Sequence, residues 1–154
     1  AGLITMRRSG KQKNWYRADD APEKMLGARG DYLVQGFELR DFLETIQEDS
    51  RLLDTRFQIS PDVLLERRAK PTPQGWVDET VQLRLARGLV YSGNVDPYMA
   101  NMIIKCDGQR QLKDLLVEMA NSLCVDLAKI TPAFCGVVRG LIERGFLLPR
   151  DFAC

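Results

Sequence analysis

Residues 94–149 read NVDPYMANMIIKCDGQRQLKDLLVEMANSLCVDLAKITPAFCGVVRGLIERGFLLP, and this stretch decides the fold of the 154-residue chain. Asp96 and Thr131 are each followed by proline, and a capping side chain before proline is a typical helix start. A further helix is expected after the Asp-Gly break at 107–108. The apolar residues 146–148 follow a glycine that suits a helix end, and they predict a strand. The segment therefore predicts three short helices and a closing strand.

Apolar side chains recur at helical spacing through the three expected helices, which places them on one side of each helix. The shared core is expected to contain Met102, Ile103, Leu115, Leu116, Met119, Val138 and Leu141. Three small helices around one core, closed by a strand, are typical of a winged-helix-like module, which we assign to residues 93–154. Such a module serves recognition more often than catalysis.

The first part of the chain, residues 1–92, predicts a small helix and β-hairpin region. Apolar residues at near-helical spacing predict a helix from residue 31 or 35 to residue 48. Residues 76–85 alternate between apolar and polar side chains, which indicates a half-buried strand. Its apolar side chains of one parity are those of Val77, Val81, Leu83 and Leu85. This strand is expected to pair with residues 63–68 across a five-residue loop, and residues 89–91 form a third short strand. The fold class is therefore α+β.

Composition excludes several classes of function. The chain has 22 basic and 21 acidic residues and a net charge of +1, so its overall charge indicates neither a nucleic-acid nor a membrane partner. It has no histidine, which removes the commonest general base and every Ser-His or Cys-His pair. No stretch is long enough to span a membrane, and no signal peptide precedes the expected fold.

The cysteines lie in the last third of the chain, and none belongs to a C-x-x-C pair. They are Cys106, Cys124, Cys135 and Cys154. Zinc sites usually use closely spaced ligand pairs, so no metal site is expected. Cys106 falls on an apolar helical face and is predicted to be a small buried thiol. Reduced cysteines favour a cytoplasmic location.

Basic charge is concentrated before Ala18, in a segment with no acidic residue. Its cations are Arg7, Arg8, Lys11, Lys13 and Arg17. Basic residues with Trp15 and Tyr16 between them suit a contact with nucleic acid or phosphate. The alternative is an exposed hairpin, with a strand at residues 3–6, whose partner sheet lies outside this chain. The chain begins with Ala-Gly rather than Met, which fits either processing or a fragment of a longer protein. We expect a fragment, because the strand at residues 3–6 has nothing before it to pair with.

A winged helix that binds DNA places its third helix in the major groove. The outward face of that helix is expected to present Cys135, Gly136, Arg139, Gly140, Glu143 and Arg144. Two arginines and a glutamate form a poor surface for reading base edges. Residues 96–154 contain seven basic and seven acidic side chains, so the module would neutralise few phosphates. Duplex DNA binding is therefore disfavoured.

Gly136 and Gly140 stand four residues apart on the third helix, where small residues let another backbone approach closely. Together with Arg139 and Arg144 they form the interaction surface that the sequence predicts. Its partner would be a neighbouring domain or a second copy of the chain in a homodimer. The alternative is that the helix simply tolerates small residues there.

Four segments spread over most of the chain carry a family pattern: DAPEKMLG at 20–27, GFELRDFL at 36–43, CDG at 106–108 and LIERGFLLP at 141–149. Together they resemble the C-terminal region that follows the catalytic domain in a group of bacterial class I S-adenosylmethionine-dependent methyltransferases. The resemblance implies that residues 2–8 end the sheet of a preceding methyltransferase domain. It also implies that S-adenosylmethionine is the cofactor of the parent protein.

The chain lacks the parts that catalysis by such an enzyme needs. No Gly-x-Gly pair stands between an expected strand and an expected helix, as a cofactor loop requires, and Gly27 and Gly30 lie in a polar linker. We therefore expect no catalytic, cofactor-binding or metal-binding residue here. The expected function is that of an accessory domain for substrate access or protein association. The alternatives are a winged-helix regulator that binds nucleic acid and an independent small enzyme.

Overall fold

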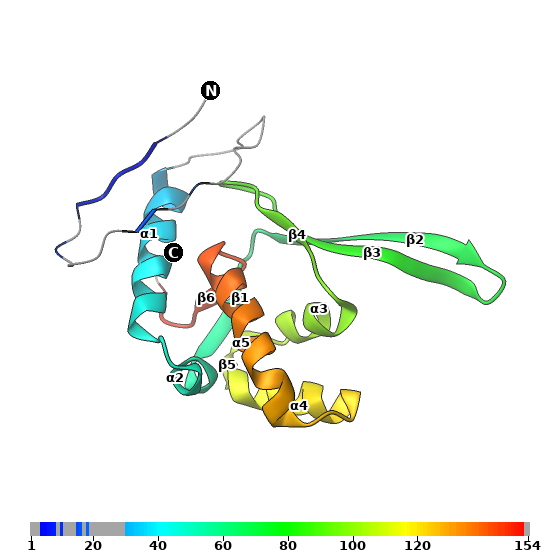
Figure 1. The fold of residues 1–154 in the computed structure, drawn as a ribbon. Helices are drawn as coiled ribbons and strands as arrows, with labels where there is room; N and C mark the ends of the chain where they lie inside the picture. Colours follow the sequence, from blue (N-terminus) through cyan, green and yellow to red (C-terminus); the bar gives the residue numbers. More distant parts are fainter. Residues whose placement is uncertain (1–3, 9, 11–14, 17, 19–29, 153–154) are drawn as a thin grey trace.

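The structure, a computed structural model, describes residues 4–8, 10, 15–16, 18 and 30–152. The helices and strands in this part of the chain are α1 Gly30–Thr45, α2 Asp49–Asp54, β1 Arg56–Ile59, β2 Val63–Thr72, β3 Gly75–Leu85, β4 Ser92–Asn94, α3 Pro97–Ile103, β5 Asp107–Gln111, α4 Leu112–Leu123, α5 Leu127–Glu143 and β6 Leu147–Pro149 (Figure 1). The strands form two antiparallel sheets of three strands each. The chain is α+β, as predicted.

The central sheet has the order β5-β1-β6. Phe57 of β1 pairs with Pro149 of β6, and on the other side Arg56 pairs with Gln111 of β5. Phe57 is buried, as are all three residues of β6. β1 precedes the hairpin in the chain, whereas β5 and β6 follow it. The division into residues 1–92 and 93–154 stays a prediction, and β1 joins the two parts in one sheet.

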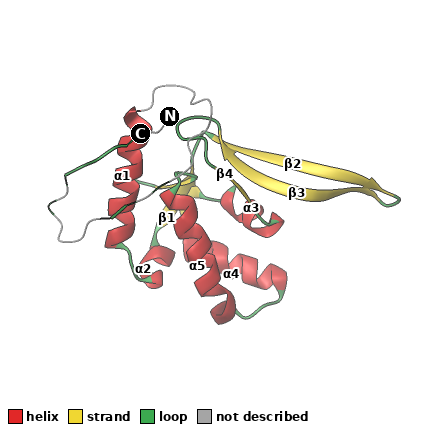
Figure 2. Ribbon diagram, turned by 45° about the horizontal axis from the view of Figure 1, so that its top comes forward, coloured by secondary structure: helices red, strands yellow, loops and turns green. Residues whose placement is uncertain are grey.

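The helices pack on this sheet around one hydrophobic core. Of the predicted core residues, Met102, Ile103, Leu115, Leu116 and Val138 are buried, and Met119 and Leu141 pack against them partly buried. Figures 1 and 2 show α5 in the middle of the body, with α1 on one side and α3 on the other. α3 starts as predicted, because the Asp96 carboxylate accepts a hydrogen bond of 2.8 Å from the Met99 N–H.

The last helix starts earlier than predicted. α5 begins at Leu127 rather than at Pro132, because the Asp126 carboxylate accepts a hydrogen bond of 3.0 Å from the Ala128 N–H and caps the helix there. Pro132 therefore lies inside α5, where it removes one backbone hydrogen bond. Burial of the apolar side of the helix, which includes Phe134, outweighs this loss.

Strand β5 begins at the break at 107–108 and runs up to α4, and the sequence did not reveal this strand. The Asp107 carboxylate accepts hydrogen bonds from the N–H groups of Gln109 and Arg110, at 2.8 and 3.3 Å. These bonds, the one from Gln109 first, lower the pKa of Asp107. Gly108 has a φ of +78°, which glycine adopts without strain. The turn that was expected to start a helix thus starts a short edge strand.

Three other element boundaries differ from the prediction. The helix expected to run to residue 48 ends earlier, at Thr45, and a short helix that was not predicted, α2, begins at Asp49. β1 was not predicted, because four residues are too few to show a period. The strand expected at 89–91 lies slightly later, at β4. Val90 has a φ of +48°, a left-handed conformation that does not fit a strand.

β2 and β3 form the predicted hairpin, but the turn is tighter. Thr72 pairs with Gly75, so the loop has two residues, 73–74, instead of five. Gly75 has a φ of +123°, which requires glycine. β4 pairs with β3 only near its base, at Gln82–Arg84. Figures 1 and 2 show the rest of the hairpin projecting from the body on the side that carries α3.

The hairpin and the helical turn predicted before residue 30 fall only partly on described residues. Residues 4–8 and 15–16 form no strand, so a hairpin is not observed at these positions. The ring of Trp15 instead packs against that of Phe37 on α1, with centroids 5.8 Å apart. The helical turn that the sequence suggested near residue 22 lies outside the described residues. Among the helices described here, none has the length and apolar character needed to cross a bilayer.

Candidate functional site

The outer part of the β2–β3 hairpin, residues 64–80, is exposed at every position, and we call it the arm. It contains three basic and three acidic side chains and is therefore neutral. Arg67 pairs with Asp78 at 3.7 Å, and Lys70 pairs with Glu79 across the strands. Because these charges pair with one another, the arm offers little attraction to phosphates.

One face of the arm carries apolar side chains at its base and at its tip, on either side of the Arg67–Asp78 ion pair. Side chains that pair directly across two strands lie on the same face, and faces alternate along a strand. Leu65 pairs with Leu83, and Pro71, six residues after Leu65, pairs with Trp76. Leu83 packs in the core and is only 4% exposed, whereas Trp76 is 76% exposed. The face that is buried at the base thus continues outward as what we call the apolar stripe: Leu65, Ala69, Pro71 and Trp76.

A β-bulge decides which side chain ends the apolar stripe. The register of β2 and β3 shifts after the Arg68 pair, which leaves Glu79 as an extra residue in β3. Without the shift Pro71 would face Val77; with it, Pro71 faces Trp76. The alternation in the sequence grouped Val77 with the core-facing residues, and this prediction is therefore wrong. Val77 lies on the opposite face and is exposed.

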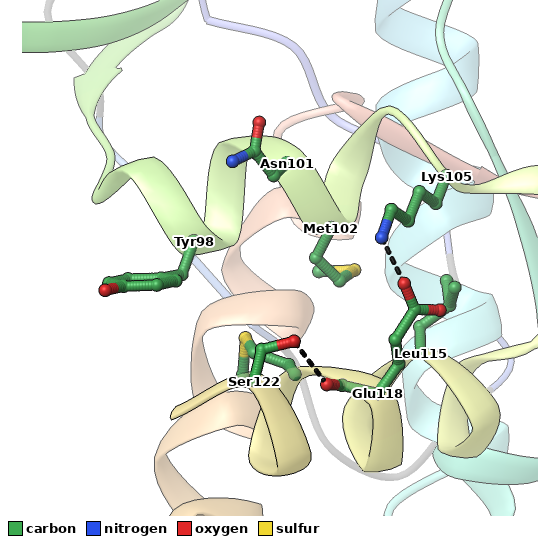
Figure 3. A pocket seen from close by; sticks show the side chains of 8 residues that line it. Tyr98, Asn101, Met102, Lys105, Leu115, Glu118 and Ser122 are labelled. Atoms are coloured by element: carbon green, nitrogen blue, oxygen red, sulfur yellow. Dashed lines mark hydrogen bonds and ion pairs between the residues drawn. The ribbon is translucent and has the colours of Figure 1, made fainter. Parts of the chain in front are cut away.

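A second apolar feature is the groove between α3 and α4 (Figure 3). It is a hollow of about 250 Å³ lined by Tyr98, Asn101, Met102, Lys105, Leu115, Glu118, Met119 and Ser122. Figure 3 shows Met102 pointing from α3 toward α4. Met102 and Leu115 are buried, whereas Tyr98 is half exposed. The floor of the groove is therefore apolar and contains two methionines, whose flexible side chains adapt to the shape of a partner.

The rim of the groove is charged. Glu118 pairs with Lys105 across the groove and accepts a hydrogen bond of 2.8 Å from Arg110. These two hydrogen bonds, the one from Lys105 first, lower the pKa of Glu118. Arg110 does not line the groove itself, but with it the cluster around Glu118 carries one net positive charge.

The arm and the groove both lie in the part of the chain that matches a known family. Residues 34–149 match the family described as "Domain of unknown function (DUF7782)". The chain belongs to this family. The DUF7782 match extends from α1 to β6, so it includes the arm and the groove and excludes the basic N-terminal segment. No curated protein matches the chain.

Two residues of the α5 face that was expected to point outward, Arg139 and Glu143, bond to other parts of the DUF7782 domain. The Arg139 guanidinium donates hydrogen bonds to the backbone carbonyls of Ile46 and Gln47, at 2.8 and 2.7 Å. Glu143 pairs with Arg40 of α1 at 3.2 Å. The chain between α1 and α2, together with α1 itself, therefore contacts part of this face, whereas Gly136 and Arg144 on it are exposed.

The two α5 glycines do not meet another backbone within the described chain. A Cβ atom at Gly136 would have no neighbour within 4 Å, and one at Gly140 would lie 3.2 Å from a nitrogen of Arg144. Arg144 donates a hydrogen bond to the Gly140 carbonyl of its own helix. The role of these residues in association stays a prediction. Cys135, predicted on the outward face, is 1% exposed because it packs in the core.

The basic N-terminal segment is only partly described. Arg7 pairs with Asp41 of α1, and its guanidinium lies 5.0 Å from the centre of the Phe37 ring. Arg8 is exposed. Lys11, Lys13 and Arg17 lie outside the described residues. Arg7 is thus engaged with α1 of the same chain, and a phosphate would compete with Asp41 for it.

The described residues contain no group of three His, Cys, Asp or Glu side chains that could hold a metal ion. Cys106 is 2% exposed, which confirms the predicted buried thiol, although it follows α3 instead of lying within it. Burial raises the pKa of Cys106 to about 12 and that of Cys135 to about 11. Since the thiolate is the nucleophile, neither cysteine is activated at neutral pH.

Proposed function

We propose that this chain is a non-catalytic accessory module of a class I S-adenosylmethionine-dependent methyltransferase and that it acts by associating with protein. The arm carries this proposal. It is exposed along its whole length, and a two-stranded ribbon without a covering layer is only marginally stable in water. An exposed apolar stripe along such a ribbon is typical of an interaction surface.

We further propose that α3, α4 and α5, with β5 and β6, form a winged-helix-like module. The order helix, strand, helix, helix, strand supports this assignment, and β1 lies between the two strands. The hydrogen bonds of Arg139 favour protein association over DNA binding, because its guanidinium already binds carbonyls of its own chain. The regulator alternative would need Arg139 to leave these carbonyls before it could contact DNA.

The methyltransferase part of the proposal rests on the resemblance of the segments quoted above. Two of them, 36–43 and 141–149, are in contact through Arg40 and Glu143. These two segments therefore belong to one packed unit. Because the chain has no glycine-rich cofactor loop, we assign S-adenosylmethionine binding and methyl transfer to a separate domain of the parent protein.

The proposal is tested on the natural reading frame that contains this chain. One version keeps the arm, and the other replaces residues 68–80 by Asn-Gly, a two-residue hairpin turn that can close on the Arg67–Val81 pair. We expect both versions to bind S-adenosylmethionine with equal affinity. Methyl transfer to the acceptor should fall at least about tenfold without the arm, since interface anchors are commonly worth that much.

Two results would contradict this function. A reading frame without a cofactor-binding methyltransferase domain would remove the parent enzyme. Unchanged kcat and KM for the acceptor in the arm-shortened enzyme, with unchanged association, would show that the arm contributes nothing to its action. A thermal melt of both versions serves as the control for folding.

A further inference from the structure

We propose that the arm docks on a second copy of this chain, with Trp76 of each copy seated in the groove between α3 and α4 of the other. This inference rests on the proposed function, because it names the partner of the same arm. Both halves of the contact are present on one chain: an exposed indole at the end of the apolar stripe and an open apolar groove.

The groove has the size and chemistry for an indole ring. A cavity of about 150 Å³ already accommodates benzene, and the groove measures about 250 Å³. Met102 and Met119 line it, and thioether sulfur makes favourable contacts with aromatic rings. Asn101 and Ser122 at the edge offer acceptors for the indole N–H, which a buried tryptophan usually satisfies.

The geometry of the chain makes the contact reciprocal. Trp76 lies at the tip of the arm, which Figure 1 shows well beyond α3, so it is remote from the groove of its own chain. The groove lies near the base of the arm, because α3 begins at Pro97, shortly after β4 pairs with the base of β3. When two arms lie antiparallel with their apolar stripes facing, each tip reaches the base of the other copy. A two-fold axis near Arg67, about midway along the arm, generates this arrangement.

Charges favour the same pairing. The tip of the arm, residues 69–79, holds one lysine and two carboxylates and is net negative. At the edge of the groove, the cluster in which Lys105 and Arg110 surround Glu118 carries one net positive charge. At the two-fold axis, the Arg67–Asp78 pair of one copy faces the same pair of the other, so each guanidinium meets a second carboxylate. Two identical chains therefore present opposite charges at both contacts.

The buried area reaches the range of stable interfaces. A buried tryptophan contributes about 150–250 Å², and its groove contributes a similar area, so two reciprocal contacts bury on the order of 800 Å² in total. The facing apolar stripes extend along roughly 20 Å of ribbon, given about 3.3 Å per residue. They bring the total to on the order of 1,200 Å², the lower limit for specific association.

Sedimentation equilibrium of this chain between about 1 and about 100 μM tests the inference, since association with micromolar Kd is visible there. We expect a monomer–dimer equilibrium. Trp76→Ala should raise the dimer Kd at least about tenfold, whereas Val77→Ala, on the opposite face, should leave it unchanged. Ser122→Arg, which fills the groove, should weaken the dimer as Trp76→Ala does. Asn121→Arg adds the same charge beside the groove and serves as its control.

Mixing two variants distinguishes a reciprocal contact from non-specific association. The Trp76→Ala chain keeps its groove, and the Ser122→Arg chain keeps its tryptophan, so a mixture can form one of the two contacts. We expect a mixed dimer of intermediate Kd where neither variant dimerises alone. Both changes are at exposed positions, and thermal melts of the separate variants check that each is folded.

The outcomes are distinct from those that test the proposed function. A monomer at every concentration, or a dimer that persists unchanged in Trp76→Ala, overturns the second copy as the partner. If the chain is monomeric while the arm-shortened enzyme loses methyl transfer, the arm binds another domain, and the association function stands. If the dimer forms as expected while methyl transfer is unaffected by the arm, the inference stands and the proposed function fails.

Discussion

The guanidinium of Arg139 donates a hydrogen bond of 2.8 Å to the backbone carbonyl of Ile46, which joins α5 to the residue after the end of α1. The same group reaches the Gln47 carbonyl at 2.7 Å and the Asp49 carboxylate at 3.1 Å. Carbonyls at a helix end lack partners within the helix, and arginine is well suited to supply them. One side chain of α5 therefore holds the junction between α1 and α2.

Arg139→Ala should lower the free energy of unfolding by about 1–3 kcal/mol, because hydrogen bonds to a charged group are lost and carbonyls are left without a donor. Urea denaturation followed by circular dichroism measures the change. Arg144→Ala is the control, since Arg144 bonds only within its own helix turn among the contacts described, and it should cost less than about 0.5 kcal/mol. Equal effects of the two changes would contradict this account.

Leu116→Ala should destabilise the protein by about 2–5 kcal/mol, the usual range for a leucine removed from a packed core. Leu116 is 1% exposed, whereas its neighbour Val117 is 43% exposed. Val117→Ala is therefore the matched control, with an expected loss below about 0.5 kcal/mol. Chemical denaturation of both variants gives the comparison. A loss at Leu116 as small as that at Val117 would mean that α4 faces the core with a different side.

The stability of the protein should fall as the pH rises above the ordinary cysteine pKa of 9.0. Burial raises the pKa of Cys106 to about 12 in the folded chain, so the unfolded chain loses the thiol proton first. Below pH 9 the contribution is fully present, and above it at most about 1.4 kcal/mol is lost per pH unit. Urea titrations at pH 8, 9 and 10 measure the slope. Cys106→Ala should reduce it, and an unchanged slope would show that this thiol is not responsible.

Gly88→Ala should destabilise the protein by about 2–4 kcal/mol. Gly88 has a φ of +70°, and an added Cβ atom would lie 2.7 Å from the Tyr32 ring, which the 2.8 Å hydrogen bond from its hydroxyl to Asp62 holds in place. Left-handed backbone and overpacking each contribute to the loss. Gly36→Ala, inside α1 and free of any clash, should instead stabilise by about 0.5–1 kcal/mol. Thermal or urea unfolding of the two variants decides whether their signs are opposite.

This chain alone should neither bind S-adenosylmethionine nor transfer its methyl group, because it has no glycine-rich turn and no acidic residue placed to hold the ribose. Isothermal titration calorimetry at micromolar protein concentration measures binding directly. Stoichiometric binding in that range would show that the cofactor site lies within these residues and would remove the accessory assignment.

The sequence correctly predicted those helices and strands whose formation depends on residues close together in the chain. Asp96 caps α3 as predicted, and the alternation in residues 76–85 correctly predicted a hairpin. β1 and β5 were missed because a strand of four residues and one reading DGQRQ have no apolar period. Their pairing is fixed by contacts with residues far along the chain. The start of α5 was misplaced because two caps compete, and Asp126, the earlier one, is used.

The candidate site was harder to predict than the fold. Trp76 faces the apolar stripe only because of the bulge at Glu79, and alternation in the sequence assigned that place to Val77. The groove was not predicted, because the sequence showed Met102 and Met119 only as apolar residues at helical spacing. Both were therefore predicted to lie in the core. Arg139 was expected on the outward face of α5, and the sequence did not show that its guanidinium would bond to the carbonyls of Ile46 and Gln47.

The order of strands in the central sheet has a consequence for how the chain folds as it is made. β1 is the middle strand, yet β6, its neighbour through Pro149, is synthesised about ninety residues later. The ribosome must therefore release almost the whole domain before β1 can be paired on both sides. Until then its buried Phe57 stays accessible to chaperones, and such long-range pairing makes folding slow. A nascent chain stalled before β6 emerges should accordingly remain sensitive to protease.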